Sequence, residues 1–174
     1  MDLKTHIRDV KDFPKPGIMF RDITTLLKNP EAFKFTFEEL LNFTKDLKIN
    51  KVVGIESRGF IYGPLLAYRL NCGFVPVRKP GKLPAEKVSV SYSLEYGEDK
   101  LEIHKDAIQN GDKVLVHDDL LATGGTMNAV CQLIEKLGGE VVQISFIIEL
   151  SFLKGREKLK PYDIRSIVNY EDEN

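Results

Sequence analysis

Short apolar runs alternate with longer amphipathic segments through the middle of the chain, and this alternation is the strongest constraint on the fold. The runs are KVVGIE (51–56), FVPVRKPG (74–81), DKVLVHDD (112–119) and EVVQISFIIEL (140–150). They are short and rich in β-branched residues, so they predict buried strands. Helical patterns follow the first and the third run, and such alternation predicts a parallel sheet with right-handed crossovers.

The rest of the chain adds smaller elements. Residues 1–12 predict a short amphipathic helix, and 29–47 predict a second helix capped by its first residue. Two prolines and a glycine make 13–22 an extended segment. Residues 88–94 alternate between apolar and polar, which predicts a half-exposed strand. KLEIH (100–104) would be its returning partner.

Composition limits the class of protein. The chain has 174 residues, a net charge of −1, 43% hydrophobic and 29% charged residues, which fits one globular domain. No basic stripe predicts nucleic-acid binding, and no run of about 18 apolar residues predicts a membrane span. The two cysteines, Cys72 and Cys131, have no metal-binding spacing, so we expect a reduced, cytoplasmic protein.

The stretch VLVHDDLLATGGTM (114–127) carries the clearest chemistry. A buried strand ends in Asp118 and Asp119, whose carboxylates can accept hydrogen bonds from paired hydroxyls or help to hold a divalent cation. The loop at 122–126 has two glycines and enters a helix, so its amides and the positive helix end can surround a phosphate. Together they predict a site for a ribose 5-phosphate unit. The alternative is an exposed strand end followed by a glycine turn.

This stretch resembles the ribose-phosphate signature of the type I phosphoribosyltransferases. FPKPGIMFRDIT, ESRGFIYGP, VRKPGKLP, SYSLEYG and ELSFLKGREKL resemble the adenine phosphoribosyltransferases of that family, in the same order and over nearly the whole chain. The resemblance implies an α/β fold with a mostly parallel central sheet flanked by helices, a flexible catalytic loop and a single domain. A small N-terminal hood would occupy 1–30 and the core 31–174.

The resemblance also implies the activity and its participants. Such an enzyme is a pentosyltransferase of purine salvage, which moves the 5-phosphoribosyl group of phosphoribosyl pyrophosphate (PRPP) to adenine and yields AMP and pyrophosphate. Mg²⁺ is the expected cofactor, held through PRPP, with Asp118 and Asp119 as candidate contacts rather than a dedicated protein site. A homodimer is expected, with no nucleic acid and no membrane as partner.

The same resemblance assigns the site residues. The ribose-phosphate site would comprise Asp118, Asp119, Ala122, Thr123, Gly124, Gly125 and Thr126. The pyrophosphate site would comprise Glu56, Ser57, Arg58, Gly59, Arg78, Lys79, Lys82 and Tyr96, with a cis peptide between Glu56 and Ser57. The adenine site would comprise Met19, Phe20, Arg21 and Leu150. The two candidate catalytic residues are Arg58, which can clamp the pyrophosphate, and Glu95, which can exchange a proton with the purine.

Two other functions stay open at this point. One is a transferase for 6-oxopurines (hypoxanthine, guanine or xanthine), for which Lys154 or Lys158 could read the oxo group. The other is a non-catalytic PRPP sensor, although such proteins usually carry a DNA-binding extension. His117 departs from the family, which usually has an apolar residue there. It is either a core histidine with a satisfied ring or a residue that tunes the charge of Asp118.

Overall fold

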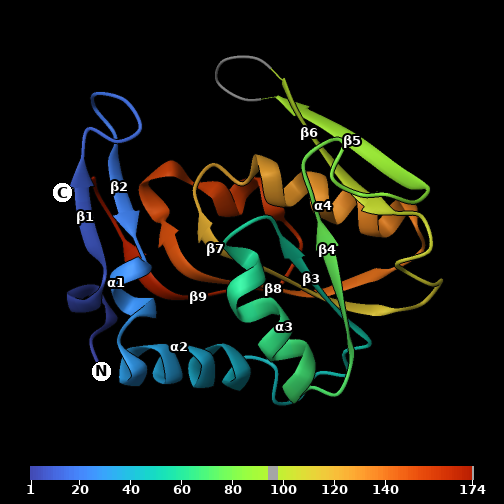
Figure 1. Ribbon diagram of the computed structural model, residues 1–174, viewed down its shortest axis with the longest axis horizontal. Helices are drawn as coiled ribbons and strands as arrows, with labels where there is room; N and C mark the ends of the chain where they lie inside the picture. The colour runs from blue at the N-terminus through green and yellow to red at the C-terminus, as the bar shows by residue number, and fades with distance from the viewer. Residues whose placement is uncertain (94–97, 174) are drawn as a thin grey trace.

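The computed structural model describes residues 1–93 and 98–173, so the predictions for Glu95 and Tyr96 lie outside the described residues. Its centre is a five-stranded sheet in the order β4-β3-β7-β8-β9, and every neighbouring pair is parallel (Figure 1). The strands are β3 (Lys51–Ile55), β4 (Gly73–Val77), β7 (Lys113–Leu121), β8 (Glu140–Leu150) and β9 (Ile164–Tyr170). The predicted parallel α/β sheet is therefore confirmed.

Both faces of the sheet are covered, which explains why its strands read as continuous apolar runs. Helix α4 (Gly125–Lys136) lies on one face, and α2 (Pro30–Asn42) and α3 (Gly59–Arg69) lie on the other (Figure 1). Along β7, Val114 and Val116 enter the core beneath α4, whereas Leu115 enters the core shared with α2 and α3. The alternation of one strand thus joins two hydrophobic cores.

The start of α2 follows the sequence rules closely. The side chain of Asn29 accepts hydrogen bonds from the amides of Glu31 and Ala32, and Pro30 occupies the first turn. The helix ends at Asn42, five residues before the predicted end at 47. Its prediction is confirmed apart from that boundary.

The predicted helix over residues 1–12 is wrong. Only a 3-10 turn forms, η1 (Leu3–His6), and β1 (Arg8–Lys11) follows it and pairs with β2 (Met19–Asp22) in an antiparallel ribbon. So short a helix is unstable alone, whereas the ribbon gives the backbone partners. Leu3 and Ile7 still reach the core, at 3% and 7% exposure, which is why the pattern resembled a helix. The short helix α1 (Thr24–Leu27) ends this region.

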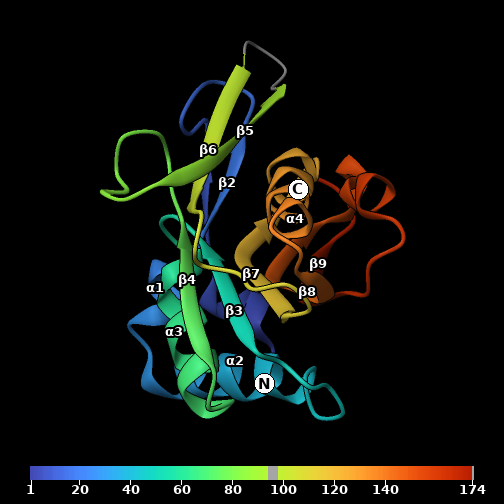
Figure 2. The same cartoon turned by 90° about the vertical axis from the view of Figure 1, so that its right-hand side faces the viewer.

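A second antiparallel ribbon stands apart from the central sheet. It consists of β5 (Lys87–Ser93) and β6 (Glu98–His104), as the alternating pattern predicted. Arg78, the first residue after β4, pairs through its backbone with Glu102 of β6, so the ribbon is attached at the carboxyl end of β4. Figures 1 and 2 show that this ribbon and the hood around β2 rise from the same end of the molecule.

The order of the strands marks a place for a ligand. The chain crosses from β3 to its neighbour β4 on one side, and from β7 to β8 on the other, so the topology switches direction between β3 and β7. In open parallel sheets, ligands bind beyond the carboxyl ends of the strands at such a point. Two further 3-10 turns, η2 (Ser151–Leu153) and η3 (Gly155–Leu159), return the chain from β8 to β9. No helix within the described ranges is long and apolar enough to cross a membrane.

Candidate active site

Two loops meet at the switch point, 56–59 after β3 and 118–125 around the end of β7. Glycine at 59 allows this meeting. A Cβ added there would lie 2.8 Å from the backbone oxygen of His117 and 3.2 Å from Oδ1 of Asp118. The start of α3 therefore lies directly against the acidic end of β7. The predicted cis peptide between Glu56 and Ser57 is present.

Asp118 and Asp119 form a crowded acidic pair. Asp119 is 3% exposed, and its amide donates to Oδ1 of Asp118 over 2.9 Å. Burial, and then the negative charge of Asp119, raise the pKa of Asp118 well above its usual range. Burial also raises the pKa of Asp119, although the positive charge of Arg58 partly offsets this. Such a pair is stabilised by hydroxyl donors or by a cation.

Arg58 connects this acidic pair to the hood. Its Nε lies 2.9 Å from Oδ2 of Asp119 without hydrogen-bond geometry, so that oxygen can still accept a hydrogen bond. Its guanidinium also lies 5.1 Å from the centre of the Phe20 ring, within the range of a cation–π contact. One side chain thus spans the gap between the core sheet and β2.

The loop before α4 has the features of an anion site. Gly124 adopts φ +79°, and a Cβ there would lie 2.5 Å from the backbone oxygen of Gly155. No side chain caps the first turn of α4, so the amides at the start of this 12-residue helix are left for another acceptor. Thr123 is exposed and Thr126 is partly exposed.

The predicted cationic residues gather on two carboxylates. The Nε of Arg78 lies 3.2 Å from Oε2 of Glu56, and the amide of Lys79 donates to the same oxygen over 2.8 Å. The ammonium of Lys82 pairs with Glu56, and that of Lys79 pairs with Asp99. Burial opposes ionisation of Glu56, but Lys82 and the other donors outweigh it and hold the pKa of Glu56 below its usual range. This cluster would suit a polyanion that displaces the carboxylates.

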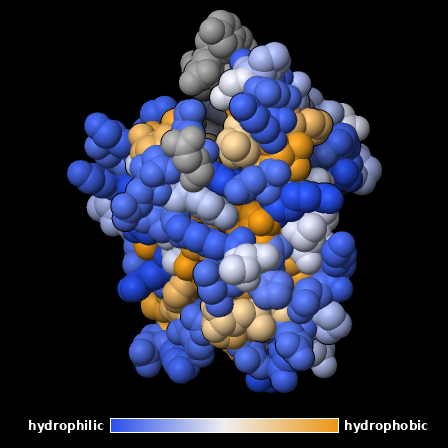
Figure 3. All heavy atoms as spheres, turned by 90° about the vertical axis from the view of Figure 1, so that its left-hand side faces the viewer, coloured by the Kyte–Doolittle hydropathy of each residue, from blue (hydrophilic) through white to orange (hydrophobic). Residues whose placement is uncertain are grey.

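A pocket of about 370 Å³ opens between the hood and the sheet, which is the size of a small-ligand site. Its wall comes from segments far apart in the sequence: Gly17, Ile18, Met19, Phe20, Arg21, Arg58, Leu120, Ala122, Leu150, Phe152, Leu153 and Glu173. All four predicted adenine residues are among them. Figure 3, which faces the hood side of the molecule, shows hydrophobic residues at the surface among hydrophilic ones.

The side chain of Arg21 holds the hood to the end of the chain. It is 1% exposed, its Nη1 lies 2.6 Å from Asp9, and its Nη2 donates to the backbone oxygen of Glu173 over 3.0 Å. Its guanidinium lies 4.0 Å from the centre of the Tyr170 ring. These contacts direct the guanidinium toward Asp9, Tyr170 and Glu173, although its Nε and Nη1 have no hydrogen-bond partner among the described residues.

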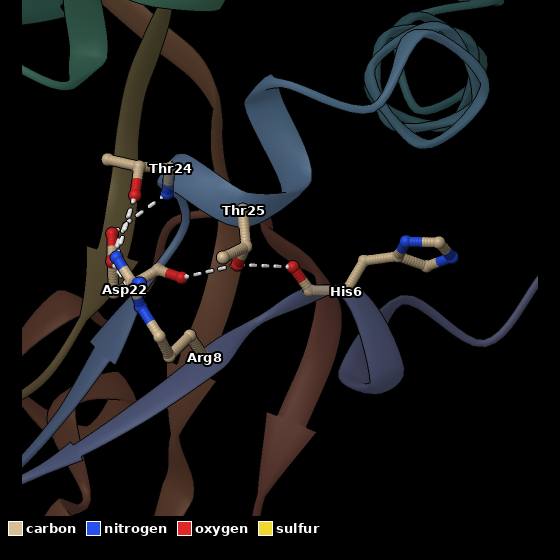
Figure 4. Close-up of polar contacts among 5 residues, drawn as sticks. All are labelled: His6, Arg8, Asp22, Thr24 and Thr25. Carbon is tan, nitrogen blue, oxygen red and sulfur yellow. Dashed lines mark hydrogen bonds and ion pairs between the residues drawn. The ribbon is translucent and has the colours of Figure 1, made fainter.

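A second polar cluster fixes the base of the hood (Figure 4). Asp22, at the end of β2, accepts from Nε of Arg8 over 3.0 Å and from the amide of Thr24 over 2.8 Å. The hydroxyl of Thr25 donates to the backbone oxygen of His6 over 2.7 Å. Burial opposes ionisation of Asp22, but the Thr24 amide and Arg8 outweigh it and lower its pKa. The strand that carries Met19 and Phe20 is therefore anchored at its end.

Sequence reasoning missed several residues of the site. The pocket is also lined by residues that had not been assigned to the site: Gly17, Ile18, Leu120, Phe152, Leu153 and Glu173. The motif ELSFLKGREKL contains two of them, so it was the available signal. Gly155, in the same motif, packs under the loop before α4.

His117 is a core residue, which was the first of the two alternatives predicted for it. It is fully buried, its Nδ1 lies 3.0 Å from the Ser145 hydroxyl, and burial lowers its pKa to about 4. The ring is only half satisfied, however, because Nε2 has no hydrogen-bond partner among the described residues. A neutral imidazole adds no positive charge beside Asp118 at neutral pH.

Comparison with known proteins places this arrangement in a family. Residues 23–172 match the phosphoribosyl transferase domain family. An adenine phosphoribosyltransferase from Clostridium botulinum is 57% identical over 170 residues, which cover 98% of this chain and 99% of the relative.

Solved structures agree with this assignment. The crystal structure of an adenine phosphoribosyltransferase from Thermoanaerobacter pseudethanolicus superposes with a TM-score of 0.95 at 53% identity, covering 97% of this chain and 98% of that one. The Saccharomyces cerevisiae enzyme, complexed with an imino-altritol bisphosphate and adenine, gives 0.89 at 41% identity, covering 95% and 96%. The fold is that of the type I phosphoribosyltransferases, and the chain belongs to the adenine phosphoribosyltransferases of that family.

Proposed function

We propose that this chain transfers the 5-phosphoribosyl group of PRPP to adenine, forming AMP and releasing pyrophosphate. The observation that carries the proposal is the shared pocket, whose wall includes Phe20 of the hood, Arg58 and Ala122 of the loop before α4. A base bound against Phe20 would therefore sit next to a phosphate-binding loop. That combination suits a nucleoside monophosphate.

The acidic pair would hold the ribose. Hydroxyls at C2 and C3 donate to the carboxylates of Asp118 and Asp119, which relieves the cost of their burial. The same negative charge favours the positive charge that develops at the anomeric carbon as pyrophosphate leaves. The amides of 123–126 and the start of α4 hold the 5-phosphate, so the sugar is fixed at both ends.

The cationic cluster would receive the leaving group. Arg58 can bind a phosphate oxygen pair with its planar guanidinium, and Lys79 and Lys82 add positive charge. Lys82 pairs with Glu56 and Lys79 pairs with Asp99, so pyrophosphate would replace contacts that these two ammonium groups already make. The proposed subsite is completed by Glu56, Ser57, Gly59, Arg78 and Tyr96.

The hood would select the base. β2 has one strand neighbour, β1, among the described residues, so the backbone groups of its other edge are free to read a purine edge. Adenine offers an acceptor beside a donor, whereas a 6-oxopurine offers the reverse and leaves partners unpaired, at about 1–3 kcal/mol each. Phe20 stacks on the ring, Leu150 forms a wall, and Glu95 exchanges a proton with the base nitrogen.

Magnesium fits this site as an ion that arrives with its substrate. No group of three His, Cys, Asp or Glu side chains lies together as a metal centre within the described parts of the chain. Two carboxylates and substrate phosphates are, however, a usual setting for Mg²⁺. When bound, the ion would neutralise phosphate charge on PRPP, and Asp118 and Asp119 are the residues placed to contact it.

The proposal extends to assembly and location. We infer a homodimer, which the exposed apolar side chains of Leu65 and Tyr68 on α3 support, at 36% and 83% exposure. We infer a cytoplasmic location, which the unpaired Cys72 and Cys131 support. Light scattering of the purified protein would test the first inference.

The decisive test of function is product formation from PRPP and Mg²⁺ with adenine, hypoxanthine and guanine offered separately. We expect AMP and pyrophosphate from adenine alone. Turnover of hypoxanthine or guanine would retain the ribose-phosphate site and refute the assignment of the hood. PRPP binding without turnover of any base would point to a sensor.

A further inference from the structure

An ion pair between Glu149 and Arg156 lies at the end of β8, and neither residue is among the proposed contact residues. Arg156 donates to both carboxylate oxygens of Glu149, with Nε 2.6 Å from Oε1 and Nη2 2.7 Å from Oε2. Nη1 of Arg156 donates to the backbone oxygen of Ile164 over 2.9 Å, and the hydroxyl of Ser166 donates to Glu149 over 2.6 Å. The ion pair and its hydrogen bonds therefore connect β8, η3 and β9.

Glu149 is held firmly in the ionised form. It is 5% exposed, and burial opposes its charge. The hydrogen bonds from Arg156 and Ser166 outweigh burial and keep the pKa of Glu149 below its usual range. A planar, bidentate pair fixes the relative orientation of both side chains, which a single contact cannot do.

The segment 150–155 lies between Glu149 and Arg156 in the chain. Its two ends contact different parts of the site. Leu150, Phe152 and Leu153 line the base pocket. At the other end, Gly155 lies under the loop before α4, where its backbone oxygen would be 2.5 Å from a Cβ on Gly124. Gly155 itself has no room for a side chain, because a Cβ would lie 2.9 Å from Cδ1 of Leu121 and would also strike the oxygen of Ala122.

We propose that Glu149 and Arg156 are positioning residues that set the spacing between the base pocket and the 5-phosphate loop. The ion pair joins the residues on either side of the segment 150–155. This segment lines the base pocket and supports the 5-phosphate loop. This inference rests on the proposed function, because it assumes that base and phosphate of one nucleotide occupy these two places. Neither residue touches the ligand.

The test measures AMP binding by calorimetry, together with the KM values for adenine and PRPP. Arg156→Gln removes the bidentate contact, and we expect it to weaken AMP binding by at least tenfold and to raise both KM values. Arg156→Lys keeps the charge without the fork and should recover only part of the affinity. Lys113→Gln is the control, because it removes an exposed ion pair with Glu140, which lies at the opposite end of β8 from Glu149.

A second variant covers the case in which Arg156→Gln does not fold. Gly155→Ala leaves the ion pair intact but pushes the segment away from Leu121, so it should weaken AMP binding in the same direction. Folded Arg156→Gln and Gly155→Ala proteins that bind AMP within twofold of the wild type would overturn the proposal, even if their melting temperatures fall. Failure of the proposed function would show separately, as wild-type protein that neither binds AMP nor consumes adenine.

Discussion

The two halves of the proposed site are built in opposite ways. The ribose-phosphate half is one continuous stretch, in which the end of β7 supplies Asp118 and Asp119 and the next loop supplies Gly124 and the start of α4. The base half is assembled from the hood, from 150–153 and from Glu173, which lie at distant points of the chain. The core sheet thus holds the charged end of the substrate. Several separate segments of the chain together surround the flat, apolar base.

This difference determines how each half is stabilised. The ribose-phosphate half depends on buried charge and on backbone geometry, both fixed by the sheet. The base half depends on anchors such as Arg21 against Tyr170 and Arg8 against Asp22. Changes in the first half should therefore affect PRPP, and changes in the second should affect adenine.

The largest effect is expected from Asp119→Asn. The change removes the charge that faces Arg58 and the developing cation, and electrostatic groups of this kind are worth about 10²–10³ in rate. Steady-state kinetics should show that loss in kcat/KM for PRPP. A loss of less than tenfold, in protein with a normal melting curve, would mean that the acidic pair does not serve the ribose.

Gly124→Ala should come next. The residue has φ +79°, which costs a non-glycine residue about 1–2 kcal/mol, and the new Cβ would press on Gly155. We expect KM for PRPP to rise about tenfold, because about 1.4 kcal/mol corresponds to that factor. KM for adenine should stay within twofold, and an equal rise in both would show that the two halves are not separable here.

Phe20→Leu tests the other half. An aromatic contact is worth about 0.5–1.5 kcal/mol beyond burial, so KM for adenine should rise by about two- to tenfold. Phe20→Tyr keeps the ring and serves as the matched control. If KM for PRPP rises as much as KM for adenine, the contact between Phe20 and Arg58 matters more than stacking on the base.

The smallest effect is one on stability, from Asp118→Asn. Because burial raises the folded-state pKa of Asp118, the folded protein is penalised once the pH exceeds the unfolded value of about 3.9. The variant lacks this penalty, so its ligand-free form should melt higher at pH 7, at about 2–4 °C per kcal/mol gained.

The sign of this effect depends on pH. Below the unfolded pKa the carboxyl is neutral in both the folded and the unfolded state, so the advantage of Asp118→Asn should vanish at low pH. It should grow as the pH rises from the unfolded pKa to the raised folded pKa and stay constant above it. Thermal scans at several pH values would measure it. A variant that melts lower than the wild type at pH 7 would contradict the claim that this carboxylate is costly to bury.

The contrast between the halves also explains what the sequence could predict. Residues 114–127 place strand, acids, glycines and helix start within one window, so local rules sufficed. The pocket wall could not be found in this way, because Glu173 and Phe152 meet the hood only after folding. The same limit explains the wrong helix over 1–12, where pairing with β2 decided the structure. The spacing of residues in the sequence also could not show that the side chain of Arg21 turns toward Tyr170.

The most direct test of this account is a crystal structure of the protein with AMP. The account predicts that the 5-phosphate lies on the amides of 123–126, that Asp118 and Asp119 accept from the ribose hydroxyls, and that the base stacks on Phe20. A phosphate bound instead at Arg78, Lys79 and Lys82, with the base outside the pocket of the hood, would contradict the division of the site proposed for this chain.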